Sequence, residues 1–153
     1  MKAIQDYYAE NYSHCYGCGP GNPKGMQIKS YPDGEQTVCR YTPGIYYTGG
    51  FPDSLYGGIL ASLIDCHAAA TASYAKLCEQ GLVLGDVPSP RFVTASLKVD
   101  YLKPAPSGRE VELRGRAVEI KNRKITVHVT LSVDGDVKVK GEVLMIQLRE
   151  ENA

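Results

Sequence analysis

The stretch "YGGILASLIDCHAAATASYA", residues 56–75, is nearly all apolar or small, and it carries a single carboxylate, that of Asp65. A surface helix normally has one apolar stripe, but helical spacing gives this segment two usable faces. One face is bulky, with Ile59, Leu63, Ile64 and the edge residue Leu60. The other consists of small residues with Asp65 as its one charge: Gly58, Ala61, Ser62, Asp65, Ala69 and Ala72. We therefore expect the sheet of the same chain to pack on one face of this helix, and something else to pack on the other.

Signals on both sides of this helix predict the neighbouring elements. Asp53 or Ser54 offers a helix N-cap, and the helical pattern ends near Cys78, before Gly81. Earlier in the chain, "MQIKS" (26–30) and "QTVCRY" (36–41) are predicted strands, joined as a hairpin by the turn "YPDGE". Residues 1–25 indicate a short helix followed by an irregular loop.

After the helix the period of the apolar residues changes to two. In "FVTASLKVDYL" (92–102), Thr94, Ser96 and Lys98 share the polar face. Three further segments are predicted strands: "REVELRGRAVEI" with a bulge at Ala117–Val118, "KITVHVTLSV", and, after the tight turn "DGD" (134–136), "VKVKGEVLMIQL". One helix against about six antiparallel strands is an α+β layout, and residues 1–153 are predicted to form one domain.

The amino-acid composition argues against several classes of binding partner. Seventeen Lys and Arg residues balance seventeen Asp and Glu residues, so we expect no nucleic-acid partner. The first residues lack the apolar core of a signal peptide, and no apolar stretch reaches membrane-spanning length. These features predict a cytoplasmic protein without a membrane partner. Five scattered cysteines do not form a disulfide framework of the secreted kind.

The cysteines and histidines are further candidates for chemistry. Cys15 and Cys18 supply half of a zinc site, but no second Cys-x-x-Cys or paired histidines follow, so no metal site is predicted and the segment is expected to be an ordered loop. Cys66 and His67 are adjacent on a helix and do not face each other, which argues against a catalytic dyad. We expect His67 to be a satisfied core residue and His128 to lie on a polar strand face.

Gly57 and Asp65 offer complementary chemistry. Glycine N–H groups at a helix start form a site for an anion or a polarised carbonyl oxygen. Asp65 offers a carboxylate that either does chemistry or is held structurally by a loop or a partner. Eight residues separate the two, or ~12 Å along a helix. One helix therefore cannot bring both to one reacting carbonyl, whereas two copies related by a two-fold axis can.

Three segments, taken in order, resemble the hotdog-fold acyl-CoA thioesterases, particularly the phenylacetate-degradation-type subgroup. They are "HCYGCGPGNPKGMQIK" (14–29), "GGILASLIDCHAAATA" (57–72) and "VTASLKVDYLKPAPSG" (93–108). The resemblance covers roughly residues 14–148 and implies a hotdog fold, in which an antiparallel sheet wraps around one long helix. It also implies a hydrolase, active as a homodimer or a dimer-of-dimers tetramer.

The resemblance implies a role for several residues. The Gly57 N–H would stabilise the oxyanion, Asp65 from the partner subunit would act as general base or nucleophile, and Thr94 would orient the water. Coenzyme A would enter as part of the substrate, and no other cofactor is implied. The expected substrate-binding residues are Tyr56, Gly58, Ser62, Asn22 and Lys103, with Lys121 and Arg123 as further candidates for the phosphates. For Asn22, an Asx turn before Pro23 is the slightly favoured alternative.

Two positions depart from the family pattern. Tyr56 stands where relatives have His, and Gly50 stands where close relatives often have Asn. These departures favour, as an alternative, a non-catalytic acyl-CoA or acyl-group binding protein on the same fold. A hotdog hydratase or dehydratase is the third alternative, and it ranks last because only His67 or His128 could replace the missing histidine.

Overall fold

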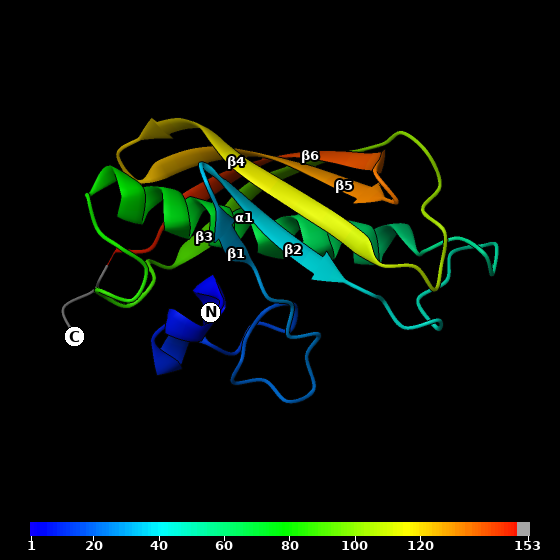
Figure 1. Cartoon of the computed structure of the whole chain (residues 1–153), viewed down its shortest axis with the longest axis horizontal. Coiled ribbons are helices and arrows are strands. Elements are labelled where there is room, and N and C mark those ends of the chain that lie inside the picture. Colours follow the sequence, from blue (N-terminus) through cyan, green and yellow to red (C-terminus); the bar gives the residue numbers. More distant parts are fainter. Residues whose placement is uncertain (150–153) are drawn as a thin grey trace.

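The computed structural model describes residues 1–149, in which a six-stranded antiparallel sheet curves around one long helix, α1 (Figure 1). This arrangement confirms the predicted α+β fold. Two 3-10 helices, η1 and η2, precede the sheet. The elements are η1 Ile4–Tyr7, η2 Glu10–Tyr12, β1 Tyr31–Asp33, β2 Gln36–Tyr41, α1 Gly57–Glu79, β3 Phe92–Tyr101, β4 Val111–Lys121, β5 Lys124–Val133 and β6 Asp136–Gln147. No helix among the described residues is long and apolar enough to span a membrane.

The strand order is β1-β2-β4-β5-β6-β3, which places β3 at one edge of the sheet. Alternate residues of the central strands point toward α1 and form the core with its bulky face. Gly115 of β4 allows a close approach to α1, because a Cβ there would lie 2.2 Å from Thr71 Oγ1 of the helix. The fully buried core residues include Leu63, Ile64, Leu113, Ile125, Val127, Leu131, Val139, Val143 and Met145.

The helix ends where the sequence predicts, but it begins later. Its last residue is Glu79, and Gly81 follows with a φ of +70°. The N-cap is Tyr56, so the prediction of Asp53 or Ser54 is wrong. Residues 54–56 cannot enter the helix because extended bridges hold them: the Leu55 N–H donates to the Ala105 carbonyl, and the Tyr56 N–H donates to the Tyr47 carbonyl.

The predicted strand at residues 26–30 is also wrong. β2 lies where expected, but its hairpin partner is the short β1, and the turn is at Gly34–Glu35. The N–H groups of Met26 and Ile28 donate instead to the carbonyls of Tyr16 and Gly17 in the preceding loop. The intervening Gln27 has a φ of +54°, which interrupts an extended strand.

Both predicted irregularities after the helix are confirmed. Asp134 and Gly135 have φ values of +50° and +80° in the two-residue turn between β5 and β6. The register of β4 against β5 shifts between Ala117 and Glu119.

A further bulge, between Thr94 and Ser96 of β3, was not predicted. Thr94 pairs with the inward-facing Met145, whereas Ser96 pairs with Leu144 on the outer surface. The bulge thus corrects the expectation that Thr94, Ser96 and Lys98 share one face, and it turns Thr94 toward α1.

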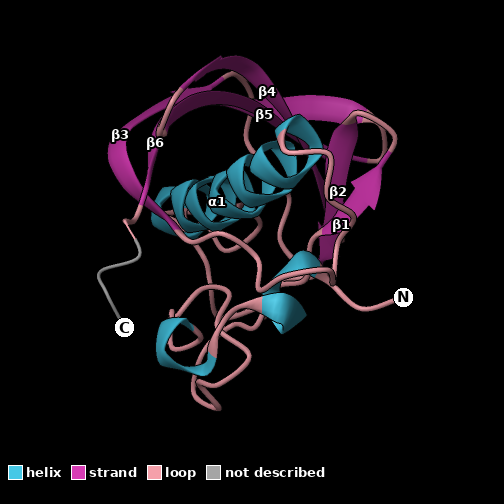
Figure 2. Ribbon diagram, turned by 90° about the vertical axis from the view of Figure 1, so that its left-hand side faces the viewer, coloured by secondary structure: helices cyan, strands magenta, loops and turns pink. Residues whose placement is uncertain are grey.

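The N-terminal segment lies on the side of α1 that faces away from the sheet (Figure 2). A buried polar network attaches it there. Ser30 and Thr37 hydrogen-bond the two ring nitrogens of His67, at 2.9 and 3.0 Å, and Ser30 is bonded in turn to Gln5. His67 is completely buried, which confirms it as a satisfied core histidine. Burial lowers its pKa to about 4, so the ring is neutral at pH 7.

Candidate active site

The start of α1 presents backbone donors. The N–H groups of Gly57 and Gly58 have no hydrogen-bond partner among residues 1–149, as expected for the first turn of a helix. The Tyr101 hydroxyl donates to the Gly57 carbonyl oxygen over 2.7 Å and so ties this turn to the end of β3. The Tyr56 ring lies against Gly58, where a Cβ would come within 2.4 Å of it. These free donors mark the positive end of the helix dipole.

A cleft of about 380 Å³ adjoins this helix start. The loop before α1 and the segment that follows β3 form its walls, and most of its lining side chains are apolar. Lys103 also lines the cleft, with its Nζ 2.9 Å from Asp136 Oδ1. The lining residues are Gly49, Gly50, Phe51, Ser54, Leu55, Gly57, Leu60, Tyr101, Leu102, Lys103, Pro104 and Ala105.

Asp65 and Thr94 form a second group, two turns further along α1. The Thr94 hydroxyl donates a hydrogen bond to Asp65 Oδ1, and both residues are at least partly accessible to solvent. Because the bulge in β3 directs Thr94 inward, the strand holds the carboxylate by one oxygen. Asp65 Oδ2 has no hydrogen-bond partner among the described residues.

In the structure, most of the predicted site residues fall into two separate groups along α1. Tyr56, Gly57, Gly58 and Lys103 surround the cleft or the helix start, and Asp65 and Thr94 form the second group. Ser62 lies exposed between the two groups, and its hydroxyl donates to the Gly58 carbonyl over 2.9 Å. Asn22 lies elsewhere. Its Oδ1 accepts a hydrogen bond from the Lys24 N–H over 3.0 Å, which forms an Asx turn around Pro23.

The sequence reasoning did not identify Tyr101. Its place at the end of an alternating strand, before "LKPAP", marked it only as the aromatic that closes β3. The backbone of α1 that it contacts is 44 residues away, and neither propensity nor spacing indicates such a contact.

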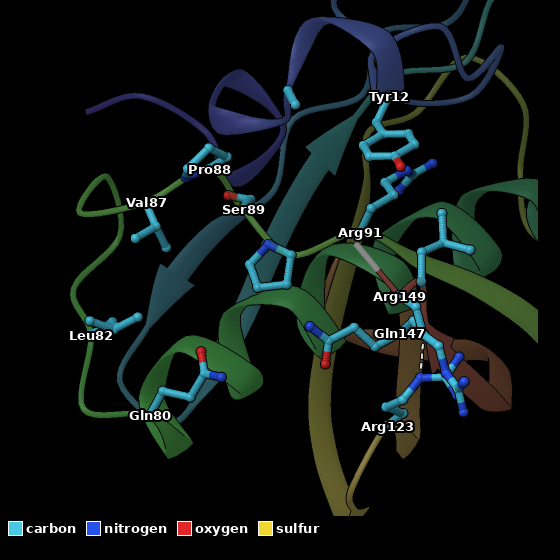
Figure 3. Close-up of a pocket in the computed structure, with 13 residues that line it drawn as sticks. Tyr12, Gln80, Leu82, Val87, Pro88, Ser89, Arg91, Arg123, Gln147 and Arg149 are labelled. Atoms are coloured by element: carbon cyan, nitrogen blue, oxygen red, sulfur yellow. Dashed lines mark hydrogen bonds between the residues drawn. The ribbon is translucent and has the colours of Figure 1, made fainter. Parts of the chain in front are cut away.

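A second and larger cleft, of about 520 Å³, lies at the opposite end of α1, near Gln80 (Figure 3). Arg91, Arg123 and Arg149 all line it. Arg123 Nε donates to the Gln147 carbonyl, and Arg91 Nη1 is buried without a hydrogen-bond partner among residues 1–149. Three guanidinium groups make this cleft suitable for an anion.

The edge strand β3 is open on the side that faces the helix. Leu97 and Tyr101 pair with the inward-facing Val143 and Val139, yet 39% and 53% of their surfaces are exposed. The helix therefore does not cover this end of the sheet. A ten-residue edge strand with exposed apolar side chains is a surface on which another strand can pair.

Comparisons with known proteins agree with this architecture. The model of the thioesterase superfamily matches residues 53–140. The acyl-coenzyme A thioesterase THEM4 of Xenopus laevis is 36% identical over 88 residues, which are 58% of this chain and 33% of that protein. The chain spans about a third of the length of the curated relatives it matches.

Two solved structures are similar as well. A thioesterase superfamily protein from Shewanella loihica PV-4 is 37% identical, with a TM-score of 0.69 over 91% of this chain and 97% of that one. The PaaI protein from the phenylacetic acid degradation operon of E. coli shares the fold, with a TM-score of 0.64 at 14% identity over 80% of each chain.

Proposed function

The chain belongs to the thioesterase superfamily, and from this premise we propose that it hydrolyses an acyl-CoA thioester to a free acid and CoA. The substrate class follows the name of its THEM4 relative. The observation that carries the proposal is the pair of groups on α1, free N–H donors at its start and a carboxylate held by Thr94. Together they supply what acyl transfer to water requires, an oxyanion site and a base.

The site is formed by two copies of the chain. Gly57 is tied to Tyr101 at the end of β3, and Asp65 is tied to Thr94 near its beginning. If β3 pairs with β3 of a second copy about a two-fold axis near Leu97, the beginning of each strand lies beside the end of the other. Asp65 of one copy then approaches the cleft and Gly57 of its partner.

The exposed inner face of β3 supports this pairing. Leu97 and Tyr101 would be buried by the second copy, and the sheet would continue across the pair without a free β3 edge. The assembly is a homodimer or a tetramer made of two such dimers.

The geometry leads to the following reaction. The thioester carbonyl oxygen accepts a hydrogen bond from the Gly57 N–H, at the positive end of the helix dipole. Asp65 takes a proton from a water molecule as that water attacks the carbonyl carbon. The tetrahedral intermediate carries its negative charge on the oxygen beside the helix start, and it collapses to the free acid by expelling the CoA thiolate, which receives the proton from Asp65. If Asp65 instead attacks the carbon itself as a nucleophile, CoA leaves first, and water then hydrolyses the acyl-Asp65 anhydride to the free acid and the Asp65 carboxylate. Thr94 keeps the Asp65 carboxylate in place.

The three-arginine cleft fits the CoA phosphates. Arg91 immediately precedes β3, and Lys103 follows it. Antiparallel pairing of two β3 strands therefore places the arginine cleft of one copy next to the cleft at the start of α1 in the other copy. Arg123, an expected phosphate residue, lines this basic cleft, and Lys121 does not.

The two alternative functions, a binding protein and a hydratase, each make a different requirement of the chain. A binding protein would keep its affinity for CoA esters and show no turnover. A hydratase would need a histidine beside the cleft, but His67 is buried in the core, and His128 lies on the outer face with its Nε2 2.9 Å from Glu142. The structure therefore offers neither histidine for that chemistry.

The test is thiol release from a panel of short, long and aromatic acyl-CoA esters. We expect Asp65→Asn to lower kcat by at least about 10²-fold, the size typical of losing a general base, while acyl-CoA binding stays intact. Asp134→Asn, in the exposed β5–β6 turn, is the matched control and should keep full turnover. Absence of turnover on every ester by a wild-type protein that binds them would instead establish a binding protein.

A further inference from the structure

Three cysteines from two distant parts of the chain meet beneath α1. The Sγ atoms of Cys15, Cys18 and Cys66 all lie within 4.8 Å of one another, and those of Cys15 and Cys66 are 3.8 Å apart. Cys15 and Cys18 belong to the N-terminal loop, and Cys66 belongs to α1. Sequence reasoning did not include Cys66 among the metal ligands, because 51 residues separate it from Cys15.

The loop is shaped around the Cys66 sulfur. A Cβ on Gly17 would lie 2.3 Å from Cys66 Sγ, so only glycine at this position leaves room for the sulfur between Cys15 and Cys18. The Gly17 carbonyl also accepts from the Ile28 N–H, which fixes the loop from its other side. The meeting of the three sulfurs is therefore enforced by the backbone.

We propose that Cys15, Cys18 and Cys66 bind a Zn²⁺ ion as three thiolates, with the fourth position open to water. In a tetrahedral zinc site with Zn–S bonds of about 2.3 Å, neighbouring sulfurs are ~3.8 Å apart, which matches the Cys15–Cys66 separation. No fourth His, Cys, Asp or Glu ligand joins the three within residues 1–149. Cys15 is only half-buried, so solvent can reach the fourth position from its side.

The surroundings suit this ion. Zn²⁺ with three thiolates carries one net negative charge, and the mostly buried guanidinium of Arg91 interacts electrostatically with all three sulfurs. Zinc binding releases the thiol protons to solvent. The ion would join the N-terminal loop to the helix that carries Asp65.

The experiment is zinc binding to the full-length, reduced protein, measured after dialysis by a colorimetric chelator assay and by native mass spectrometry. We expect one Zn²⁺ per chain in the wild type. Cys15→Ser, Cys18→Ser and Cys66→Ser should each lose most of the bound zinc. Cys78→Ser, which removes an exposed cysteine outside the group, should keep it.

A second variant retains every thiol. Gly17→Ala should weaken zinc binding at least about tenfold, because the added methyl group displaces Cys66 Sγ. Circular dichroism identifies the variants that are folded. Because Cys15 is only half-buried, Cys15→Ser should disturb folding least of the three cysteine variants. Co²⁺ should give sulfur-to-cobalt charge-transfer bands in the wild type. Folded, reduced wild type that retains no zinc and gives no such bands would overturn the proposal, as would zinc binding that survives Cys15→Ser.

Discussion

At the scale of single residues, Asp65 and Gly57 differ in how the fold supports them. Asp65 depends on a side chain, because the Thr94 hydroxyl donates to its Oδ1. Gly57 depends on backbone geometry alone, and its N–H is available because it is the first residue of α1. Spacing on the helix indicated both residues. The Thr94–Asp65 contact was not predicted, because the bulge that turns Thr94 inward leaves no clear mark in "FVTASLKV".

The Gly57 N–H can be removed without disturbing the helix. Proline is favoured at the first helical position, where it lacks the N–H, and the extended Tyr56 before it has φ −60° and ψ 127°, which suits a residue that precedes proline. We expect Gly57→Pro to lower kcat for thiol release by about 10²–10³-fold, the usual loss for one oxyanion donor. Circular dichroism checks that the helix is kept.

Gly57→Ala is the matched control. It keeps the N–H, and its Cβ would make ordinary contacts of 3.5 Å with the Tyr101 ring, so kcat should stay within a few-fold of the wild type. Equal losses in the two variants would show that the N–H itself does not stabilise the oxyanion.

At the scale of elements, the edge strand β3 carries both Thr94, which contacts Asp65, and Tyr101, which contacts Gly57. The alternating pattern identified this strand, as it identified β4, β5 and β6. The strand prediction for residues 26–30 was wrong. The segment "MQIKS" has a strand-like composition, but the N–H groups of Met26 and Ile28 donate to carbonyls of the N-terminal loop. Sequence patterns report local preference, and this segment is determined by contacts with a loop ten residues earlier.

The proposed pairing of two β3 strands predicts the effect of a charge at their centre. Leu97→Asp places two carboxylates near each other across the two-fold axis, where like charges are destabilising. We expect this variant to sediment as a monomer at concentrations where the wild type is a dimer, and to lose thioesterase turnover with the dimer. Val83→Asp, in the exposed loop after α1, should change neither property. A Leu97→Asp protein that is monomeric yet fully active would place the whole site within one chain.

At the scale of the whole molecule, the fold holds a polar network inside an otherwise apolar core. His67, Ser30, Thr37 and Gln5 connect α1, β2 and the N-terminal segment. The sequence indicated that His67 would be buried. It did not reveal the partners, which come from segments 30 to 62 residues away and meet only in the folded chain.

This network predicts how stability depends on pH. The pKa of His67 is about 4 in the folded protein and about 6.5 when unfolded, so the unfolded chain binds the proton first as pH falls. The contribution of His67 is complete above pH 6.5 and is lost between pH 6.5 and 4. We expect the free energy of unfolding in urea to fall by about 2 kcal/mol from pH 6.5 to pH 5 through this residue.

His67→Gln should flatten the pH dependence between pH 6.5 and 5, and His128→Gln, at an exposed position, should retain it. The lowered pKa values of Asp6 and Glu112 affect stability below pH 4.5, outside this window. A wild type whose stability is the same at pH 6.5 and pH 5 would contradict a neutral, buried His67.

A site built from Gly57 of one copy and Asp65 of the other is tested by mixing two inactive variants. Asp65→Asn and Gly57→Pro are unfolded together, refolded as an equal mixture and assayed for thiol release. Half of the dimers are then mixed, and one of their two sites has both an intact Gly57 N–H and an intact Asp65. The mixture should regain about a quarter of wild-type turnover, as two-fold symmetry requires. No recovery in a mixture that forms mixed dimers would contradict a site shared between the two copies.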